Sequence, residues 1–456
     1  MIENILHGKW LKLVVALLLL ASAGELVLRG PVRLLRHGIT WNDFLSPYIQ
    51  AKAWEHGSDP YSPQSLISFW PADNERPFWV DAEARSGLLE KRRGMPSPYP
   101  LPSLVIIAVF TAFPWTPAVA AWTVLSTIAV LFAALALVSI SGCRLTELRS
   151  QLFVAAALAL APLHTGLGTA NPAILAVSLT VLSHWAACKS REKMATFLLA
   201  IAICLKPTVA GGLLVYYVVR RRWRPAGLTC LIAAFITGIG AARLAMAGVH
   251  WWASYAENTR RMFSTGSIDD FARSDRLRFD MINVQIVLGN FLSSPVVVNT
   301  ISRLVAVGLL VVWLWRCLKN QSQTGLLEIS AVLVLSMVAI YHRFYDAALL
   351  IWPLAWCILL VKRTWITALT MAAIAPFFIP GQAMLAGFTR SGEGSTAVTK
   401  SWWWNGIILP HQVWVLLLLT VLLLIFMGRN VPEGDPTAER ASKAARPAFS
   451  RDAQQL

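Results

Sequence analysis

Long apolar runs separated by short polar stretches dominate the pattern of hydrophobic positions along the chain. About 20 consecutive apolar residues cross the hydrocarbon core of a bilayer as a helix, so such runs predict transmembrane helices. We therefore expect an all-α, polytopic integral membrane protein with about twelve transmembrane helices, of which the shorter ones suit half-helices or re-entrant pieces. The predicted segments are 9–28, 99–114, 117–141, 151–167, 171–188, 194–218, 226–245, 296–318, 326–341, 346–361, 364–380 and 411–427.

Composition supports a membrane protein. Hydrophobic residues make up 56% of the 456 residues and charged residues only 14%, against roughly a quarter in soluble proteins. Many of the 20 Trp stand at the ends of apolar runs, where amphipathic rings settle at a bilayer interface. The six Cys lie in or beside apolar segments, without CxxC or Cys/His metal spacing, so we expect neither a disulfide framework nor a zinc site.

The net charge of +16 has a topological interpretation. In a soluble protein it would raise the question of nucleic-acid binding, but here many basic residues flank apolar runs, as the positive-inside rule describes. No nucleic-acid partner is therefore expected. The clearest cluster is Arg220–Arg224, and we place it on the cytoplasmic side.

Counting spans from that cluster sets the remaining loops. The N-terminus, Arg316–Lys319, Lys362-Arg363 and the C-terminal tail then face the cytoplasm. The loops 29–98, 246–295 and 381–410 face outside and are expected to carry short interfacial helices. Two short basic loops, Arg144–Arg149 and Lys189–Lys193, fall outside against the rule.

The chain divides into one membrane domain and a tail. Residues 1–428 form the predicted domain, and residues 429–456 mix Pro, Gly, Ala and charges, as a disordered tail does. Ala21-Ser22-Ala23 resembles a signal-peptidase site, but the apolar run continues to Leu28, so an uncleaved first helix is expected. The chain has no glycine-rich phosphate loop and no soluble nucleotide-binding domain, so a nucleotide-sugar or ATP is not expected as direct substrate.

The first outer loop carries the most informative motif. Asp43 follows the first span closely, and Phe44, Tyr48 and Ala51 then recur at helical spacing, which predicts a short helix along the membrane interface. Gly57-Ser58-Asp59-Pro60-Tyr61 ends that helix with turn residues. On residue type alone, Asp43 has an alternative role as the N-cap of this helix, and Asp59-Pro60 has one as a plain turn.

Two further groups of polar residues interrupt apolar segments. Lys206 lies about eleven residues from either end of its segment, where a lysine faces a cavity or a partner more often than lipid. The alternatives are a contact with a lipid phosphate, a structural ion pair or snorkelling to the interface, and Pro207 predicts a helix break beside it. Later, His342, Arg343, Tyr345 and Asp346 open another span, which is either a plain polar boundary or a binding cluster. His342 and Asp346 stand four residues apart, on one helical face.

These motifs together resemble glycosyltransferase family 87, the polyprenyl-phosphate-mannose-dependent mannosyltransferases of the C-type membrane superfamily. The resemblance spans roughly residues 5–430 and is carried by the order of several short motifs. They are the Asp43-Phe44…Gly57-x-Asp59-Pro60-Tyr61 pattern, Tyr99-Pro100-Leu101-Pro102, Gly168-Thr169-Ala170-Asn171, Leu205-Lys206-Pro207 and His342-Arg343-Phe344-Tyr345-Asp346. The sequence departs from the family's Tyr-Pro-Pro at Leu101-Pro102 and from its Gly-Gln-x-Asn at Thr169.

The resemblance implies an inverting hexosyltransferase that takes a hexose, expected to be mannose, from a polyprenyl-phosphate donor. The acceptor would be a lipid or glycan, and the other partners membrane lipids. An acidic residue of the first outer loop is the general base in this superfamily, and Asp43 holds the matching position. No cofactor is expected. The expected substrate-binding residues are Tyr48, Asp59, Tyr61, Asn171, Lys206, His342, Arg343 and Asp346.

Two other classes of function are weighed against the transferase. A transporter or lipid flippase explains Lys206 and broken spans, but it predicts paired repeats with matched broken segments, and the sequence shows none. It also gives no reason for a long polar first loop. A structural assembly subunit requires that Asp43 be dispensable. We therefore expect an enzyme of the cell membrane with its site on the extracytoplasmic side.

Overall fold

The structure is all-helical over the residues that it describes, which confirms the predicted all-α class. This computed structural model describes residues 2–76, 99–262, 270–272, 278–319, 324–362, 364–390, 399 and 401–429. An isolated antiparallel bridge joins Met281 and Arg343. Residues 77–98 of the first outer loop, and the predicted tail beyond Arg429, lie outside the described residues.

The helices follow one another with short connections. In the N-terminal half they are α1 (Ile2–Val27), η1 (Leu28–Val32), η2 (Leu34–Gly38), α2 (Leu45–Glu55), α3 (Pro63–Ser68), α5 (Leu101–Thr111), α6 (Trp115–Ile140), α7 (Leu148–Leu158), α8 (Ala161–Gly168), α9 (Pro172–Cys188), α10 (Glu192–Leu205) and α11 (Pro207–Val219). In the C-terminal half they are α12 (Trp223–Met246), α13 (Trp251–Met262), η4 (Arg278–Asp280), α14 (Val284–Phe291), α15 (Pro295–Lys319), α16 (Leu326–Ala339), η5 (Phe344–Leu350), α17 (Ile351–Ala355), η6 (Trp356–Leu360), α18 (Thr364–Ile374), η7 (Ala375–Phe378), α19 (Gly381–Arg390), η8 (Trp404–Ile408) and α21 (His411–Gly428). The η segments are short π or 3-10 helices.

Among the described residues, five helical stretches are long and apolar enough to cross a membrane. They are Trp10–Gly38, Trp115–Ile140, Trp223–Met246, Pro295–Lys319 and His411–Gly428, and the pair α7–α8, bent by 45°, makes a sixth if it is counted as one span. Each remaining predicted segment is helical too, but in pieces of 10–17 residues, so the number of about twelve spans stays a prediction. Large apolar side chains on α1, α12 and α15 are exposed, as expected of helices that face lipid.

The predicted span 194–218 is two helices instead of one. Helix α10 ends before Lys206, whose backbone leaves the helical region (φ −154°, ψ 89°), and α11 starts at Pro207. A proline lacks an N–H group and disfavours helical backbone in the residue before it. The predicted break at Pro207 is therefore confirmed.

The two helices fold back on each other as a hairpin. The Ser183 hydroxyl in α9 donates a hydrogen bond, 2.8 Å long, to a backbone carbonyl in the first turn of α10. The neighbouring His184 ring packs against Tyr217 near the end of α11, with the ring centroids 6.3 Å apart. The loop Lys189–Lys193 and the cluster Arg220–Arg224 thus lie at the same end of the bundle.

The second basic loop, Arg144–Arg149, lies at the same end of the bundle as Arg220–Arg224. The Trp185 indole near the end of α9 donates a hydrogen bond to the Ser139 hydroxyl near the end of α6, over 3.3 Å, so the loop that follows α6 lies beside the loop Lys189–Lys193. Arg220 donates to a carbonyl at the end of α15. The prediction that Arg144–Arg149 and Lys189–Lys193 face away from Arg220–Arg224 is therefore wrong. It counted two segments as crossings that are not: the hairpin of α10 and α11, and the short α5, whose start contacts the hairpin tip and whose end contacts the first loop.

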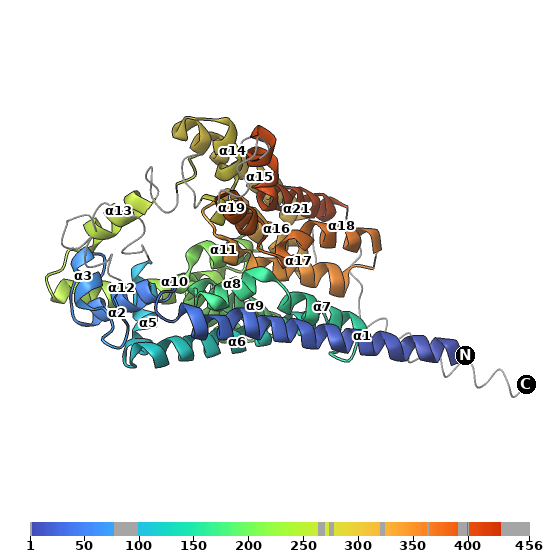
Figure 1. The fold of residues 1–456 in the computed structure, drawn as a ribbon, viewed down its shortest axis with the longest axis horizontal. Helices are drawn as coiled ribbons and strands as arrows, with labels where there is room; N and C mark the ends of the chain where they lie inside the picture. Colours follow the sequence, from blue (N-terminus) through green and yellow to red (C-terminus); the bar gives the residue numbers. More distant parts are fainter. Residues whose placement is uncertain are drawn as a thin grey trace, which may run out of the picture.

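The three predicted outer loops gather at the opposite end. Ser254 of the second loop donates 2.6 Å to the Asp59 carboxylate of the first. Gln382 of the third loop donates to the Phe279 carbonyl of the second, 2.7 Å away. Helices α2, α3 and α13 lie together at the end of the molecule away from the N-terminus (Figure 1).

The predicted helix after Asp43 is confirmed as α2, but most of its side chains are buried in the protein. Gly57 follows it with φ +68° and ends it, as its turn residues predicted.

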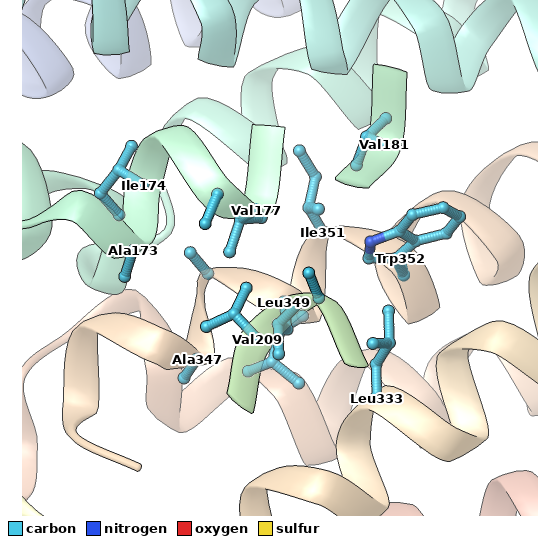
Figure 2. Packing of buried hydrophobic residues seen from close by; sticks show 14 of the residues in the cluster. Ala173, Ile174, Val177, Val181, Val209, Leu333, Ala347, Leu349, Ile351 and Trp352 are labelled. Atoms are coloured by element: carbon cyan, nitrogen blue, oxygen red, sulfur yellow. The ribbon is translucent and has the colours of Figure 1, made fainter. Parts of the chain in front are cut away.

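The centre of the bundle is an apolar core between four helical segments. Side chains of α9, α11, α16 and the η5–α17 segment converge there (Figure 2). Val177 of α9, Val209 of α11, Leu333 of α16 and Trp352 of α17 are each almost fully buried. This packing holds the hairpin tip at Lys206 against the start of η5.

Candidate functional site

Asp43 does not cap the helix that follows it. The Asn42 side chain accepts a hydrogen bond from the Phe44 N–H at 3.0 Å, and no side-chain cap is found at the start of α2. The structure therefore does not support a role for Asp43 as the N-cap of α2. Its carboxylate is left to other contacts.

The carboxylate of Asp43 meets the turn between α8 and α9. Asn171 Nδ2 donates to Asp43 Oδ2 at 2.9 Å, and the Asp43 backbone N–H donates to the Thr169 carbonyl at 2.8 Å. Asn171 is also the N-cap of α9, since its Oδ1 accepts from the Ala173 N–H. Asp43 is half-buried, and its Oδ1 has no hydrogen-bond partner among the described residues.

An unusual backbone conformation shapes this turn. Ala170 has a φ of +51°, which is unfavourable for a residue with a side chain. The Trp122 indole donates to the Ala170 carbonyl at 3.1 Å, and the Phe44 ring stacks on Trp122 with centroids 4.6 Å apart. The same tryptophan thus holds the turn and the residue after Asp43.

A second cluster forms around Asp346. Lys206 Nζ lies 2.6 Å from Asp346 Oδ1. Asp346 Oδ2 lies 3.0 Å from His342 Nδ1 and accepts from the Arg343 N–H at 3.1 Å. The carboxylate is almost fully buried, so these partners compensate a charge that would otherwise be strongly unfavourable. Of the alternatives for Lys206, the structure shows the ion pair.

His342 stands outside the helix that it was predicted to open. Helix η5 begins at Phe344, yet the predicted pairing of His342 with Asp346 is present. His342 is fully buried, and its Nε2 has no hydrogen-bond partner within the described part of the chain. Beside it, the Arg343 Nε donates to the Tyr341 hydroxyl at 2.6 Å.

Two tyrosines connect the clusters. Tyr99 is partly buried and interacts electrostatically with the Asp43 and Asp346 carboxylates and with Arg343. Tyr345 packs against α8, and Lys206 Nζ lies 4.7 Å from its ring centroid. The ends of α8, the α10–α11 tip and the start of η5 therefore form one polar region.

Sequence reasoning assigned no role to Tyr99 or Tyr345. Tyr99 had a signal, because it opens the Tyr99-Pro100-Leu101-Pro102 motif before α5. Tyr345 stood inside the polar cluster at the start of η5, but only its position against α8 and Lys206 relates it to Asp43.

The other three candidates of the first loop contact the protein itself. Tyr48 donates to the Phe113 carbonyl at 2.8 Å. The Asp59 carboxylate accepts from the Tyr61 N–H and from a hydroxyl of α13, as a turn residue does. Tyr61 donates to the Tyr99 carbonyl at 2.9 Å. These contacts brace the loop that carries Asp43.

Metal ligands are a separate question. Over the residues that the structure describes, no group of three or more His, Cys, Asp or Glu side chains could hold a metal ion.

Comparison with known proteins gives one match. A model of glycosyltransferase family 87 matches residues 98–340, just over half of the 456 residues. The matched region includes Tyr99, Asn171 and Lys206, whereas Asp43 and His342 lie outside it. No curated protein and no solved structure matches the chain.

Proposed function

Since the chain belongs to glycosyltransferase family 87, we propose that this glycosyltransferase takes its sugar from a polyprenyl-phosphate donor and inverts the anomeric carbon. The sugar is a hexose, expected to be mannose, and the acceptor is a lipid or glycan. Family membership favours a transferase over the transporter and the assembly subunit.

The observation that carries the proposal is the state of the Asp43 carboxylate. One oxygen accepts from Asn171, while Oδ1 has no partner among the described residues and the side chain is half-buried. A general base needs an ionised group with an accessible lone pair near the reacting hydroxyl. Asp43 meets this need at the edge of a region that also holds Tyr99 and Arg343.

The proposed step balances without a further reactant. The acceptor hydroxyl gives its proton to Asp43 Oδ1 as its oxygen bonds to the anomeric carbon. The bond between that carbon and the phosphate oxygen breaks, and polyprenyl phosphate leaves with the electron pair. This leaving group is a stable anion, so activation of the hydroxyl is the main task of the protein.

We assign the leaving phosphate to the cluster around Asp346. Arg343 carries N–H donors suited to phosphate oxygens, and the Nε2 of His342 serves as a second donor when the imidazole carries both protons. Asp346 orients His342 through its Nδ1, and Lys206 holds Asp346 in place. In this assignment Lys206 acts through Asp346, because its charge is already paired.

The proposed location is the cell membrane, with the site on the extracytoplasmic side. The basic loops Arg144–Arg149, Lys189–Lys193 and Arg220–Arg224 share one end of the bundle, as the positive-inside rule requires of a cytoplasmic face. The loop that carries Asp43 lies with the other predicted outer loops at the opposite end.

A transfer assay tests the proposal. Purified protein in nanodiscs receives radiolabelled polyprenyl-phosphate-mannose or polyprenyl-phosphate-glucose together with a membrane lipid extract. We expect label to enter a lipid or glycan product, and we expect this transfer to survive EDTA. Transfer from a nucleotide-sugar with none from either polyprenyl-phosphate donor would refute the donor class. Loss on chelation with recovery on adding Mg²⁺ would refute the metal-independent step.

A further inference from the structure

We propose that Asn171 is a positioning residue for Asp43, which fixes the carboxylate in the orientation that it needs for its part in the reaction. This inference rests on the proposed function of Asp43 as general base. It gives Asn171 a role through Asp43 in place of the substrate contact that the family resemblance implied.

The amide of Asn171 can have only one orientation. Its Oδ1 accepts from the Ala173 N–H at 2.9 Å, so its Nδ2 must be the atom that faces Asp43. A flipped amide would set an oxygen against the carboxylate and an N–H against an N–H. Asn171 is only 2% exposed, and its side chain contacts the start of α9 and the Asp43 carboxylate.

The turn before Asn171 adds a second point of attachment. The Asp43 N–H donates to the Thr169 carbonyl, so the turn holds both the main chain and the side chain of Asp43. Trp122 fixes the strained Ala170 within that turn. This arrangement directs Oδ2 to Asn171 and leaves Oδ1 for the acceptor.

The surroundings of Asp43 make the Asn171 contact important. The titratable and charged groups of neighbouring segments are Tyr99, Tyr345 and Arg343, while the Arg33 side chain lies beside Gly168 at the start of the turn. Among the described residues, Asn171 is the one side chain that donates a hydrogen bond to the carboxylate. Replacing this donor with a carboxylate therefore changes the charge that Asp43 faces.

The test is Asn171→Asp. Asp is as good an N-cap as Asn, so α9 keeps its cap, but a second carboxylate now faces Asp43 across about the same distance. Two adjoining carboxylates favour a shared proton. We expect the acid limb of the pH–kcat profile to move up by about one unit or more, with roughly tenfold lower kcat at pH 7 that recovers at higher pH.

Asn171→Ser is the matched control. It keeps a capping oxygen and removes the donor without adding charge, so we expect kcat to fall while the acid limb moves less than in Asn171→Asp. The KM for the donor and the Tm should stay near wild type in both variants. An unchanged pH profile in Asn171→Asp, or a loss of kcat that is equal at every pH, would overturn the positioning role.

Failure of this inference and failure of the proposed function give different results. If Asp43→Asn remains active, Asp43 is not the base and the proposed function is wrong at its centre. If Asp43→Asn is inactive while Asn171→Asp has a wild-type pH profile, Asp43 remains the base and only the role of Asn171 is refuted.

Discussion

The replacement Asp43→Asn separates catalysis from structure. Asn has the shape of Asp and can still accept from Asn171 Nδ2 and donate its backbone N–H to Thr169, the two contacts that hold Asp43. In the variant, the hydrogen bond from Asn171 goes to a neutral amide oxygen instead of a carboxylate, which lowers the free energy of unfolding by about 1 kcal/mol. The variant should therefore fold, with a Tm only a few degrees lower.

The expected loss of rate is far larger. Removing a general base lowers turnover by roughly 10²–10⁴-fold, which corresponds to about 2.7–5.4 kcal/mol of transition-state stabilisation. The measurement is single-turnover transfer of radiolabelled mannose from polyprenyl-phosphate-mannose by protein in nanodiscs. Donor binding should stay near wild type, because the phosphate is assigned to the cluster around Asp346.

The same loop offers a matched control. Asp59 is also a carboxylate, but both of its oxygens accept from within the protein, from the Tyr61 N–H and from Ser254. Asp59→Asn should lower the Tm while turnover stays within about tenfold of wild type, above the range for loss of a base. If Asp43→Asn keeps more than about a tenth of wild-type turnover, or Asp59→Asn loses more than Asp43→Asn, the reasoning about Asp43 is refuted.

Two other predictions concern stability and topology. Lys206→Met leaves the buried Asp346 carboxylate with one partner fewer and should lower the free energy of unfolding by about 3–5 kcal/mol. The double variant Lys206→Met/Asp346→Asn should regain part of that loss. Thermal unfolding in detergent measures the effect, and a Lys206→Met variant as stable as wild type contradicts the prediction. In a background without the native cysteines, an impermeant maleimide should label Ser86→Cys but not Thr146→Cys in intact cells, and the reverse pattern refutes the orientation.

Features that depend on residues close together in the chain were predictable from the sequence. Apolar runs predicted where the helices lie, since a segment without charges can satisfy its backbone only as a helix in lipid. Pro207 predicted the break before α11 and Gly57 the end of α2, because these residues act on their own backbone. The match to family 87 likewise rests on the order of residues along the chain.

The partners of the polar residues, by contrast, follow from the tertiary structure alone. Asp43 and Asn171 are 128 positions apart, and Lys206 and Asp346 are 140 apart, so neither pairing leaves a local sequence pattern. The fold-back of α10 and α11 escaped the sequence for the same reason. A hydropathy pattern shows that a segment is apolar but not the direction in which it runs. For α11, that direction is set by packing against α9 and α16, where Val209 and Leu333 lie together in the core.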